Sequence, residues 1–196
     1  MKILAFLPSQ YLTDLGATLP VAPILSFPDS SIIKNGNPFF IPDFDTDFSA
    51  HIYFAIKISR LGKSIAPRFA ERYYSEIAPA LTVKADNLLA NLQRSGLPWT
   101  SAVGFDKSVA IGEFINYSEE DSFTFTIHAD GQEAVSISVP DKKNISDAIA
   151  EASRYNSLKM GDLILIPALT PDIRLIIGER LTAVVNDKEL LKFPIK

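Results

Sequence analysis

The chain has 196 residues, a mass of 21.6 kDa and 47% hydrophobic residues, which is the length and composition of one folded domain with a sizeable core. Its net charge of −4 argues against a nucleic acid partner, because a surface that binds phosphates is basic. The sequence contains no cysteine, which excludes disulfide bonds, thiolate metal sites and a cysteine nucleophile.

Short strands separated by turn residues are predicted along the first third of the chain. Residues 2–6 form an apolar, edge-like strand, and Pro8 ends this run too early for a signal peptide. Residues 31–34 and 38–41 flank a turn at Asn35-Gly36, which predicts a hairpin-like pair. Residues 51–58 alternate strictly between two faces of a strand. The face predicted to lie in the core consists of Ile52, Phe54, Ile56 and Ile58.

Two or three helices are expected to interrupt the strands. Ser64 can cap a helix over residues 64–77, with Phe69, Tyr73 and Ile77 along one stripe. A second helix is predicted over residues 84–94, because leucines recur at helical spacing and Gly96 is placed to end it. A third, shorter amphipathic helix is predicted over residues 145–155.

Strands return in the last third of the chain. Residues 123–128 and 134–139 are predicted to form a hairpin around Asp130-Gly131. Further strands are expected at residues 163–166 and 181–185. The fold class is therefore α+β and β-rich, without repeats, a linker or a second domain. No run approaches the roughly 18 apolar residues of a membrane span, so we expect a cytoplasmic protein without membrane contact.

Several short segments together resemble the fumarylacetoacetate hydrolase family. They occur in family order, with plausible spacing. They are PDSSI at residues 28–32, RLGK at 60–63, GLPW at 96–99, GFD at 104–106, AIG at 110–112, KMGDLI at 159–164 and IGERL at 177–181. The resemblance implies a mixed β-sheet roll or sandwich with two or three short flanking helices. It also implies one domain over residues 1–196, in which residues 1–27 form an N-terminal strand and a divergent lid-like segment.

Enzymes of this family bind a divalent metal that polarises a diketo or oxo acid as a Lewis acid. Two of their carboxylate ligands lie two residues apart at a strand start, and the resemblance places that pair at Ser49 and His51. The third carboxylate corresponds to Asn87, and a family lysine corresponds to Val103. These four side chains carry no carboxylate, whereas Mg²⁺ and Mn²⁺ prefer anionic oxygen ligands. The sequence therefore predicts a cavity without a metal.

Two acidic residues close to these positions leave an alternative open. Asp47 precedes Ser49 by two residues, and Asp86 precedes Asn87 by one, so either could act as a displaced ligand. With His51, they would form a relocated site for Mg²⁺ or Mn²⁺. His51 could also bind another metal together with Asp47, Asp86 and Tyr53, although filling a vestigial cavity is the simpler interpretation.

Two further chemical interpretations are weaker. The alternating acids of residues 43–47 resemble a calcium loop, but they lack its glycine and its terminal glutamate. A catalytic triad of Ser49, His51 and an aspartate has poor geometry, because side chains two apart on one strand point in parallel.

The leading functional hypothesis is a family-like protein that has lost metal-dependent chemistry. It would act as a non-catalytic domain that dimerises or binds a small ligand, without a cofactor and without catalytic residues. The alternative is an active enzyme that uses Mg²⁺ or Mn²⁺ held by relocated ligands. That enzyme would be a carbon–carbon bond hydrolase of the family, or a related isomerase or decarboxylase, acting on a diketo or oxo acid. A homodimer is expected from the resemblance, since closed two-fold pairs are the commonest soluble assemblies.

Overall fold

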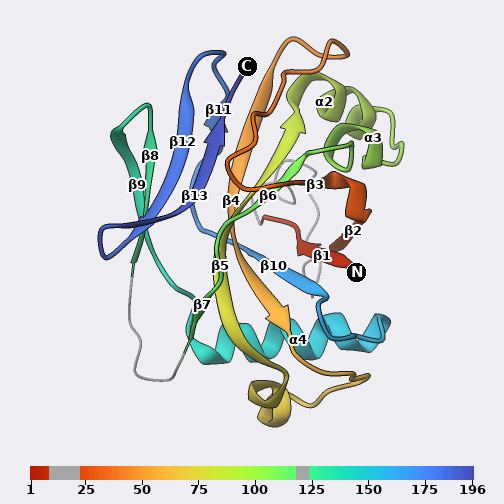
Figure 1. The fold of residues 1–196 in the computed structure, drawn as a ribbon. Helices are drawn as coiled ribbons and strands as arrows, with labels where there is room; N and C mark the ends of the chain where they lie inside the picture. The colour runs from red at the N-terminus through yellow and green to blue at the C-terminus, as the bar shows by residue number, and fades with distance from the viewer. Residues whose placement is uncertain (9–22, 118–123) are drawn as a thin grey trace.

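A computed structural model describes residues 1–8, 23–117 and 124–196, and it shows a large curled sheet with a smaller sheet against one face (Figure 1). In these residues nine strands form the large sheet, whose main path runs β2-β1-β10-β4-β5-β6-β3. No helix within the same ranges is long and apolar enough to cross a membrane. The strands of the large sheet are β1 (Ile3–Phe6), β2 (Ile24–Phe27), β3 (Ile32–Ile33), β4 (Phe48–Ile58), β5 (Tyr74–Ala85), β6 (Val109–Ile111), β7 (Ile115–Asn116), β10 (Leu163–Pro167) and β11 (Ile173–Arg174).

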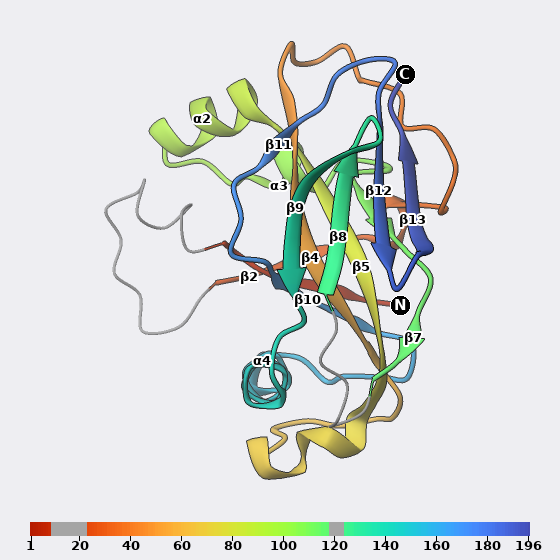
Figure 2. The same cartoon turned by 90° about the vertical axis from the view of Figure 1, so that its left-hand side faces the viewer.

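Four strands form the smaller sheet in the described part of the chain, in the order β13-β12-β8-β9. Figure 2 shows this sheet lying in front of β4 and β5, so that the two sheets make a sandwich. Its strands are β8 (Thr124–Ala129), β9 (Gln132–Ser138), β12 (Arg180–Val185) and β13 (Lys188–Pro194). The strand-rich α+β class with a curled mixed sheet, predicted from the sequence, is confirmed.

Helices lie at two ends of the sandwich. The helices α2 (Asp86–Arg94) and α3 (Thr100–Val103) follow β5, whereas α4 (Lys142–Tyr155) crosses the opposite end (Figures 1 and 2). Asp141 caps α4, because its carboxylate accepts a hydrogen bond from the backbone N–H of Asn144 at 2.7 Å. Two 3-10 helices, η1 (Asp29–Ser31) and η2 (Pro67–Tyr73), complete the helical elements in the described residues.

Strand β4 separates two cores. Ile52, Phe54 and their neighbours on the same face pack against the smaller sheet and α4. Tyr53 and Ala55, on the other face, belong to a second core with residues of β1, β5 and α3. The alternation predicted for residues 51–58 is thus confirmed. Because successive side chains of a strand point to opposite faces, one sequence pattern supplies both cores.

The predicted helix over residues 64–77 is wrong. Ser64 has a φ of 50°, which is not the extended conformation of an N-cap residue, and β5 begins at Tyr74. The stripe misleads because Phe69 lies on the 3-10 helix η2 and is exposed, whereas Ile77 is buried in β5. The whole of β5 was missed for this reason, and Lys84 belongs to its end rather than to the start of α2.

Two strand predictions also need correction. Residues 31–34 and 38–41 do not pair with each other, because β3 pairs with β6 and Phe39 bridges Ile195 near the C-terminus. The strand over residues 2–6 is not an edge, since β1 lies between β2 and β10. Its four residues are buried, which explains their apolar character.

Most of the remaining elements are confirmed. Helix α2 ends before Gly96, which has a φ of +65°, and α4 extends the third predicted helix by one turn at its start. The predicted hairpin is formed by β8 and β9, although Phe123 lies outside the described residues. The single-domain assignment of residues 1–196 stays a prediction, and residues 9–22 of its lid-like segment also lie outside the described ranges.

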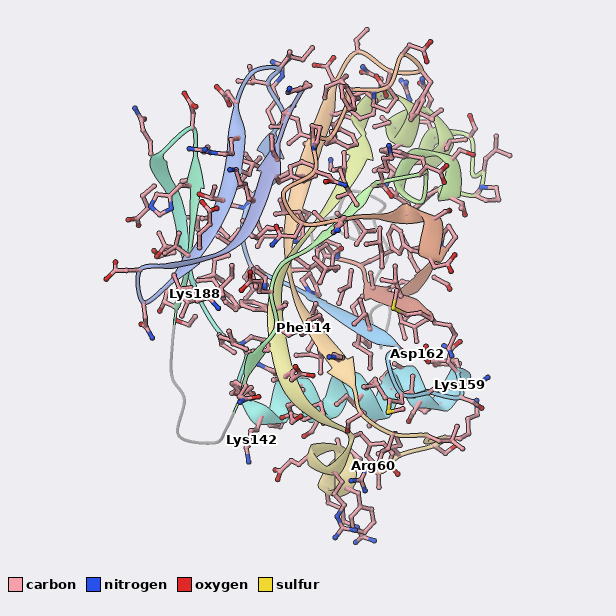
Figure 3. The ribbon with its side chains drawn as sticks, viewed as in Figure 1. Arg60, Phe114, Lys142, Lys159, Asp162 and Lys188 are labelled. Atoms are coloured by element: carbon pink, nitrogen blue, oxygen red, sulfur yellow. The ribbon has the colours of Figure 1, made fainter. Side chains whose placement is uncertain are left out.

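The buried carboxylate of Asp162 explains one of the family-like segments. Its oxygens accept hydrogen bonds from the backbone N–H groups of Lys2 and Lys159, each at 2.8 Å, beside the start of β10 (Figure 3). The ammonium of Lys2 lies 2.6 Å away. Burial raises the pKa of Asp162, but these hydrogen bonds and the Lys2 charge outweigh it and hold that pKa below its usual value. Asp162 therefore ties the N-terminus to β10 and has a structural role.

Candidate functional site

Five polar side chains converge beside the N-terminal half of β4. We call them the polar cluster: Ser49, His51, Lys84, Asp86 and Asp172. Antiparallel pairing of β4 with β5 sets Ser49 opposite Lys84. The short strand β11 pairs with the same half of β4, which carries Asp172 to His51 although 121 positions separate them in the sequence.

His51 is fully buried, and both nitrogens of its ring face oxygen acceptors. Nδ1 lies 2.6 Å from Asp172 Oδ1, and Nε2 lies 3.2 Å from the carbonyl oxygen of Ala168. Both ring nitrogens are therefore engaged with oxygens of the protein. His51 therefore fixes the loop that follows β10, and neither nitrogen directs a lone pair toward a metal in this arrangement.

Lys84 lies between two carboxylates. Its Nζ is 2.6 Å from Asp86 Oδ1 and 3.1 Å from Asp172 Oδ2. Burial opposes the charged form of Lys84, but the hydrogen bond to Asp86 and the charges of both aspartates outweigh it and raise its pKa. The Ser49 hydroxyl donates to the same Asp86 oxygen at 2.8 Å. Both acids of the cluster are thus paired with one internal cation.

The pKa of Asp172 is held below its usual value for the complementary reason. Burial raises this pKa, whereas the hydrogen bond from His51 and the adjacent charge of Lys84 lower it by more. At neutral pH the carboxylate is therefore ionised and paired on both of its oxygens, with His51 at Oδ1 and Lys84 at Oδ2.

The polar cluster does not fit a divalent cation. Its only two anionic groups already bind the ammonium of Lys84, and a dication at the same carboxylates would lie beside that positive charge. Across residues 1–8, 23–117 and 124–196, no group of three or more histidine, aspartate and glutamate side chains is arranged to hold a metal ion.

Two residues predicted for the same site lie apart from the polar cluster. Asn87 is exposed at the start of α2, and its Nδ2 donates to Asp45 Oδ1 at 2.8 Å and to Asp47 Oδ2 at 3.2 Å. Asp47 also accepts a hydrogen bond from Arg174 at 2.6 Å. The hydrogen bond from Asn87 is the main reason that the pKa of Asp47 is lowered. Asp45 and Asp47 therefore pair with α2 and β11 instead of joining His51.

Val103 lies on the Tyr53 side of β4, within the second core. Tyr53 is buried there, its ring centroid lies 5.1 Å from that of His51, and its hydroxyl hydrogen-bonds with Thr82. Burial raises the pKa of Tyr53, so its hydroxyl stays protonated at neutral pH. Thr82 lies opposite His51 in the β4–β5 register. This side of β4 is filled by packed, uncharged side chains next to the polar cluster.

The structure thus brings together Ser49, His51 and Asp86, but not Asn87, Val103 or Asp47. Sequence reasoning missed Lys84, Thr82 and Asp172. Alternation along β5 would have placed Lys84 and Thr82 on one face, but Pro79 and the helical stripe before it disguised the strand. Asp172 follows Thr170-Pro171, a turn pattern that carried no signal of its pairing with a distant histidine.

Two curated relatives of the sequence carry the same enzyme name. The chain is 25% identical over 188 residues to the Arabidopsis thaliana protein named oxaloacetate tautomerase FAHD1, mitochondrial, covering 93% of this chain and 84% of the relative. It is 22% identical over 108 residues to the Rattus norvegicus protein of the same name, covering 55% of this chain and 49% of the relative. No family model matches the sequence.

Solved structures share the fold across the whole chain. Fumarylpyruvate hydrolase from Pseudomonas aeruginosa, in complex with Mn²⁺ and pyruvate, superposes with a TM-score of 0.82 at 16% identity, covering 99% of this chain and 88% of that one. A protein from Yersinia pestis CO92 assigned to the fumarylacetoacetate hydrolase family superposes with a TM-score of 0.84 at 20% identity, covering 100% and 93%. At these identities the likeness establishes a common fold, and the chemistry has to be argued from the site itself.

Proposed function

We propose that this chain, which belongs to the fumarylacetoacetate hydrolase superfamily, is a compact single-domain member without metal-dependent catalysis. The family resemblance drawn from the sequence is thereby confirmed. Under this proposal, the protein is cytoplasmic, binds a small ligand and has no metal cofactor. The fold serves as a stable scaffold, and the polar cluster holds the scaffold together instead of activating a substrate.

One observation carries this proposal: the Lys84 ammonium lies between Asp86 and Asp172. A metal ion that acts as a Lewis acid needs anionic ligands and an open coordination position for the substrate. Here the anionic oxygens are occupied by an internal cation, and the neighbouring imidazole is buried against Asp172 and Ala168. The cluster therefore offers no charged group directed at a substrate.

The alternative function is an active enzyme with relocated metal ligands, and the names of two similar proteins support it. One is named an oxaloacetate tautomerase, and one solved neighbour is a fumarylpyruvate hydrolase with Mn²⁺. The relocated site would need Asp47, Asp86 and His51 to converge. Arg174 binds Asp47 and Lys84 binds Asp86, so that two ion pairs would have to break before a metal could bind. This favours the metal-independent interpretation.

The test is a direct assay of metal-dependent turnover. The purified chain is given oxaloacetate or fumarylpyruvate with Mn²⁺ or Mg²⁺, and the Pseudomonas aeruginosa fumarylpyruvate hydrolase serves as the positive control. The proposal predicts rates equal to those of the buffer with either metal. A rate that requires the metal and disappears with EDTA would establish the alternative.

We also propose a homodimer, which the family resemblance suggests. The exposed side chains of Phe40, Ile176 and Ile177 support it. They flank the C-terminal residues, because the backbone of Phe39 pairs with Lys196 and Gly178 N–H donates to Ile195. An apolar surface of this kind is a common feature of subunit interfaces. Light scattering after size exclusion should give twice the mass of the chain, and a single-chain mass would contradict the dimer.

A further inference from the structure

A cleft of about 1200 Å³ opens on the face of the large sheet opposite the polar cluster. Helix α4 forms one wall, and β9, the end of β10 and the turn before η2 form the others. We call it the α4 cleft. It contains Phe54, whose side chain points away from the side of β4 that carries His51 and Tyr53. Its apolar lining includes Phe6, Phe54, Ile65, Val135, Ala148 and Ile166.

Two buried oxygens of the α4 cleft lack hydrogen-bond partners within the described part of the chain. Thr170 is 8% exposed, and its Oγ1 has no partner there. Glu151 uses Oε2 to accept a hydrogen bond from Arg154 at 2.9 Å, but its Oε1 has none. Unsatisfied buried polar atoms are uncommon, because each one loses its hydration without compensation. A ligand that supplies hydrogen-bond donors would satisfy them.

The charges around the α4 cleft are mainly negative. Asp141, Asp147 and Glu151 line it from the start and middle of α4, against the single cation Arg154. Asp147 is bound by Lys143 at 2.9 Å, but Lys143 is strongly exposed and lies outside the lining. Three acids and two unpartnered oxygens therefore favour a ligand head group that donates hydrogen bonds and carries positive charge.

We propose that the α4 cleft binds a small amphipathic amine, with its apolar part against Phe54 and Ile166 and its ammonium toward Glu151 and Thr170. This inference rests on the small-ligand part of the proposed function and gives that function a site and a chemical class of ligand. The site is separate from the polar cluster, although the two share a loop. The carbonyl of Ala168 accepts from His51, and the same residue lines the α4 cleft.

Three probes with one apolar body test the head-group requirement. Octylamine, 1-octanol and octanoate are titrated into the full chain by isothermal calorimetry at neutral pH. The proposal predicts that octylamine binds most tightly, that octanol binds more weakly and that octanoate shows no measurable binding. Equal affinity for octylamine and octanoate would overturn the head-group assignment. Absence of binding by all three probes would overturn the α4 cleft as an amine site.

Matched variants locate the bound amine. Ala148→Phe fills the cleft from α4 and should abolish octylamine binding, whereas Ala90→Phe on the exposed side of α2 should leave it unchanged. Thr170→Val removes one hydroxyl and should weaken octylamine binding about 3- to 10-fold, the range for one lost hydrogen bond. Thr182→Val, an equally buried threonine outside the cleft, is its control. Binding that survives Ala148→Phe in a folded variant would contradict the location.

The two proposals fail in different ways. Metal-dependent turnover would overturn the proposed function without affecting amine binding in the α4 cleft. Loss of the amine preference would overturn this inference and leave the metal-independent assignment of the polar cluster in place.

Discussion

The polar groups on the two faces of β4 differ in whether they have partners within the protein. On one face, the carboxylates of Asp86 and Asp172 are paired with Lys84, and His51 is bonded on both ring nitrogens. On the other face, a cleft of about 1200 Å³ keeps the buried oxygens of Thr170 and Glu151 without partners in the described residues. On the face of β4 that corresponds to the family's enzyme site, the polar groups are thus paired with one another. On the other face, the α4 cleft keeps polar atoms that a ligand could engage.

The largest expected effect comes from removing the internal cation of the polar cluster. Lys84→Met leaves two partly buried carboxylates without their shared ammonium and should lower the free energy of unfolding by about 3–4 kcal/mol, the lower part of the range for breaking a buried ion pair. The same variant should gain a stability response to Mn²⁺, which can then bind both aspartates. Urea unfolding with and without Mn²⁺ measures both effects.

A matched lysine on the same sheet controls that experiment. Lys57 pairs with Glu76 at 2.8 Å, but both side chains are more than one third exposed. Lys57→Met should therefore change stability by no more than about 1 kcal/mol and should gain no response to Mn²⁺. Equal losses for the two lysine variants would remove the distinction between the polar cluster and an ordinary surface ion pair.

The apolar face of β4 is tested by Ile52→Ala. Ile52 is fully buried between the sheets, and truncation should cost about 3 kcal/mol through lost contacts and a residual cavity. The variant should show no response to Mn²⁺, since it leaves Lys84 and both aspartates in place. A metal response equal to that of Lys84→Met would show that general destabilisation, and not the missing cation, creates the site.

An intermediate and pH-dependent effect is expected for Asp172→Asn. The folded-state pKa of Asp172 lies below its ordinary value of 3.8, so its stabilisation is present at neutral pH and is lost as the pH falls through the folded-state value. The variant should be less stable than the wild type by about 2 kcal/mol at about pH 7, and this difference should shrink below about pH 4. Unfolding free energies across that range give the comparison.

The control for this prediction is Asp130→Asn in the exposed β8–β9 turn. Asparagine tolerates the positive φ of 48° at this position, so the substitution should change the stability at neutral pH very little. A stability difference for Asp172→Asn that is constant with pH would contradict the assigned ionisation of this carboxylate.

The smallest change in stability is expected at the α4 cleft, and it is a gain, whereas the substitutions above are expected to lower stability. Thr170→Val replaces an unpartnered buried hydroxyl by a methyl group of the same shape. The variant should be more stable than the wild type by up to about 1 kcal/mol in the absence of ligand. Thermal unfolding of ligand-free protein measures this, and a clear loss of stability would show that the hydroxyl already has a partner.

The sequence was sufficient for the fold class and for the elements with clear local signals. Alternation identified β4 and its two faces, and Asp130-Gly131 identified the β8–β9 hairpin. Strand β5 escaped because aromatic residues before it recur at helical spacing and Pro79 interrupts a central strand. Without β5, the residues that lie opposite β4 could not be identified either.

The candidate site was predicted only in part, because non-local pairing decides it. Ser49, His51 and Asp86 were named from the sequence, and the structure brings them together. Lys84 changes the interpretation of these three residues from a metal site to an internally paired cluster, since its ammonium lies where a metal would have to bind the acids. Its role required the β4–β5 register, and that of Asp172 required the pairing of β11 with β4, neither of which is encoded by local spacing.

Thermal unfolding of the wild-type chain with millimolar Mg²⁺, Mn²⁺ and Zn²⁺, against an EDTA control, tests the central claim most directly. A metal at a hundredfold excess over its Kd would add about 2.7 kcal/mol of apparent stability. Because the ammonium of Lys84 already pairs with both Asp86 and Asp172, we expect the same Tm in all four conditions. A clear rise in Tm with Mg²⁺ or Mn²⁺ would contradict the metal-independent assignment and restore an enzyme with relocated ligands.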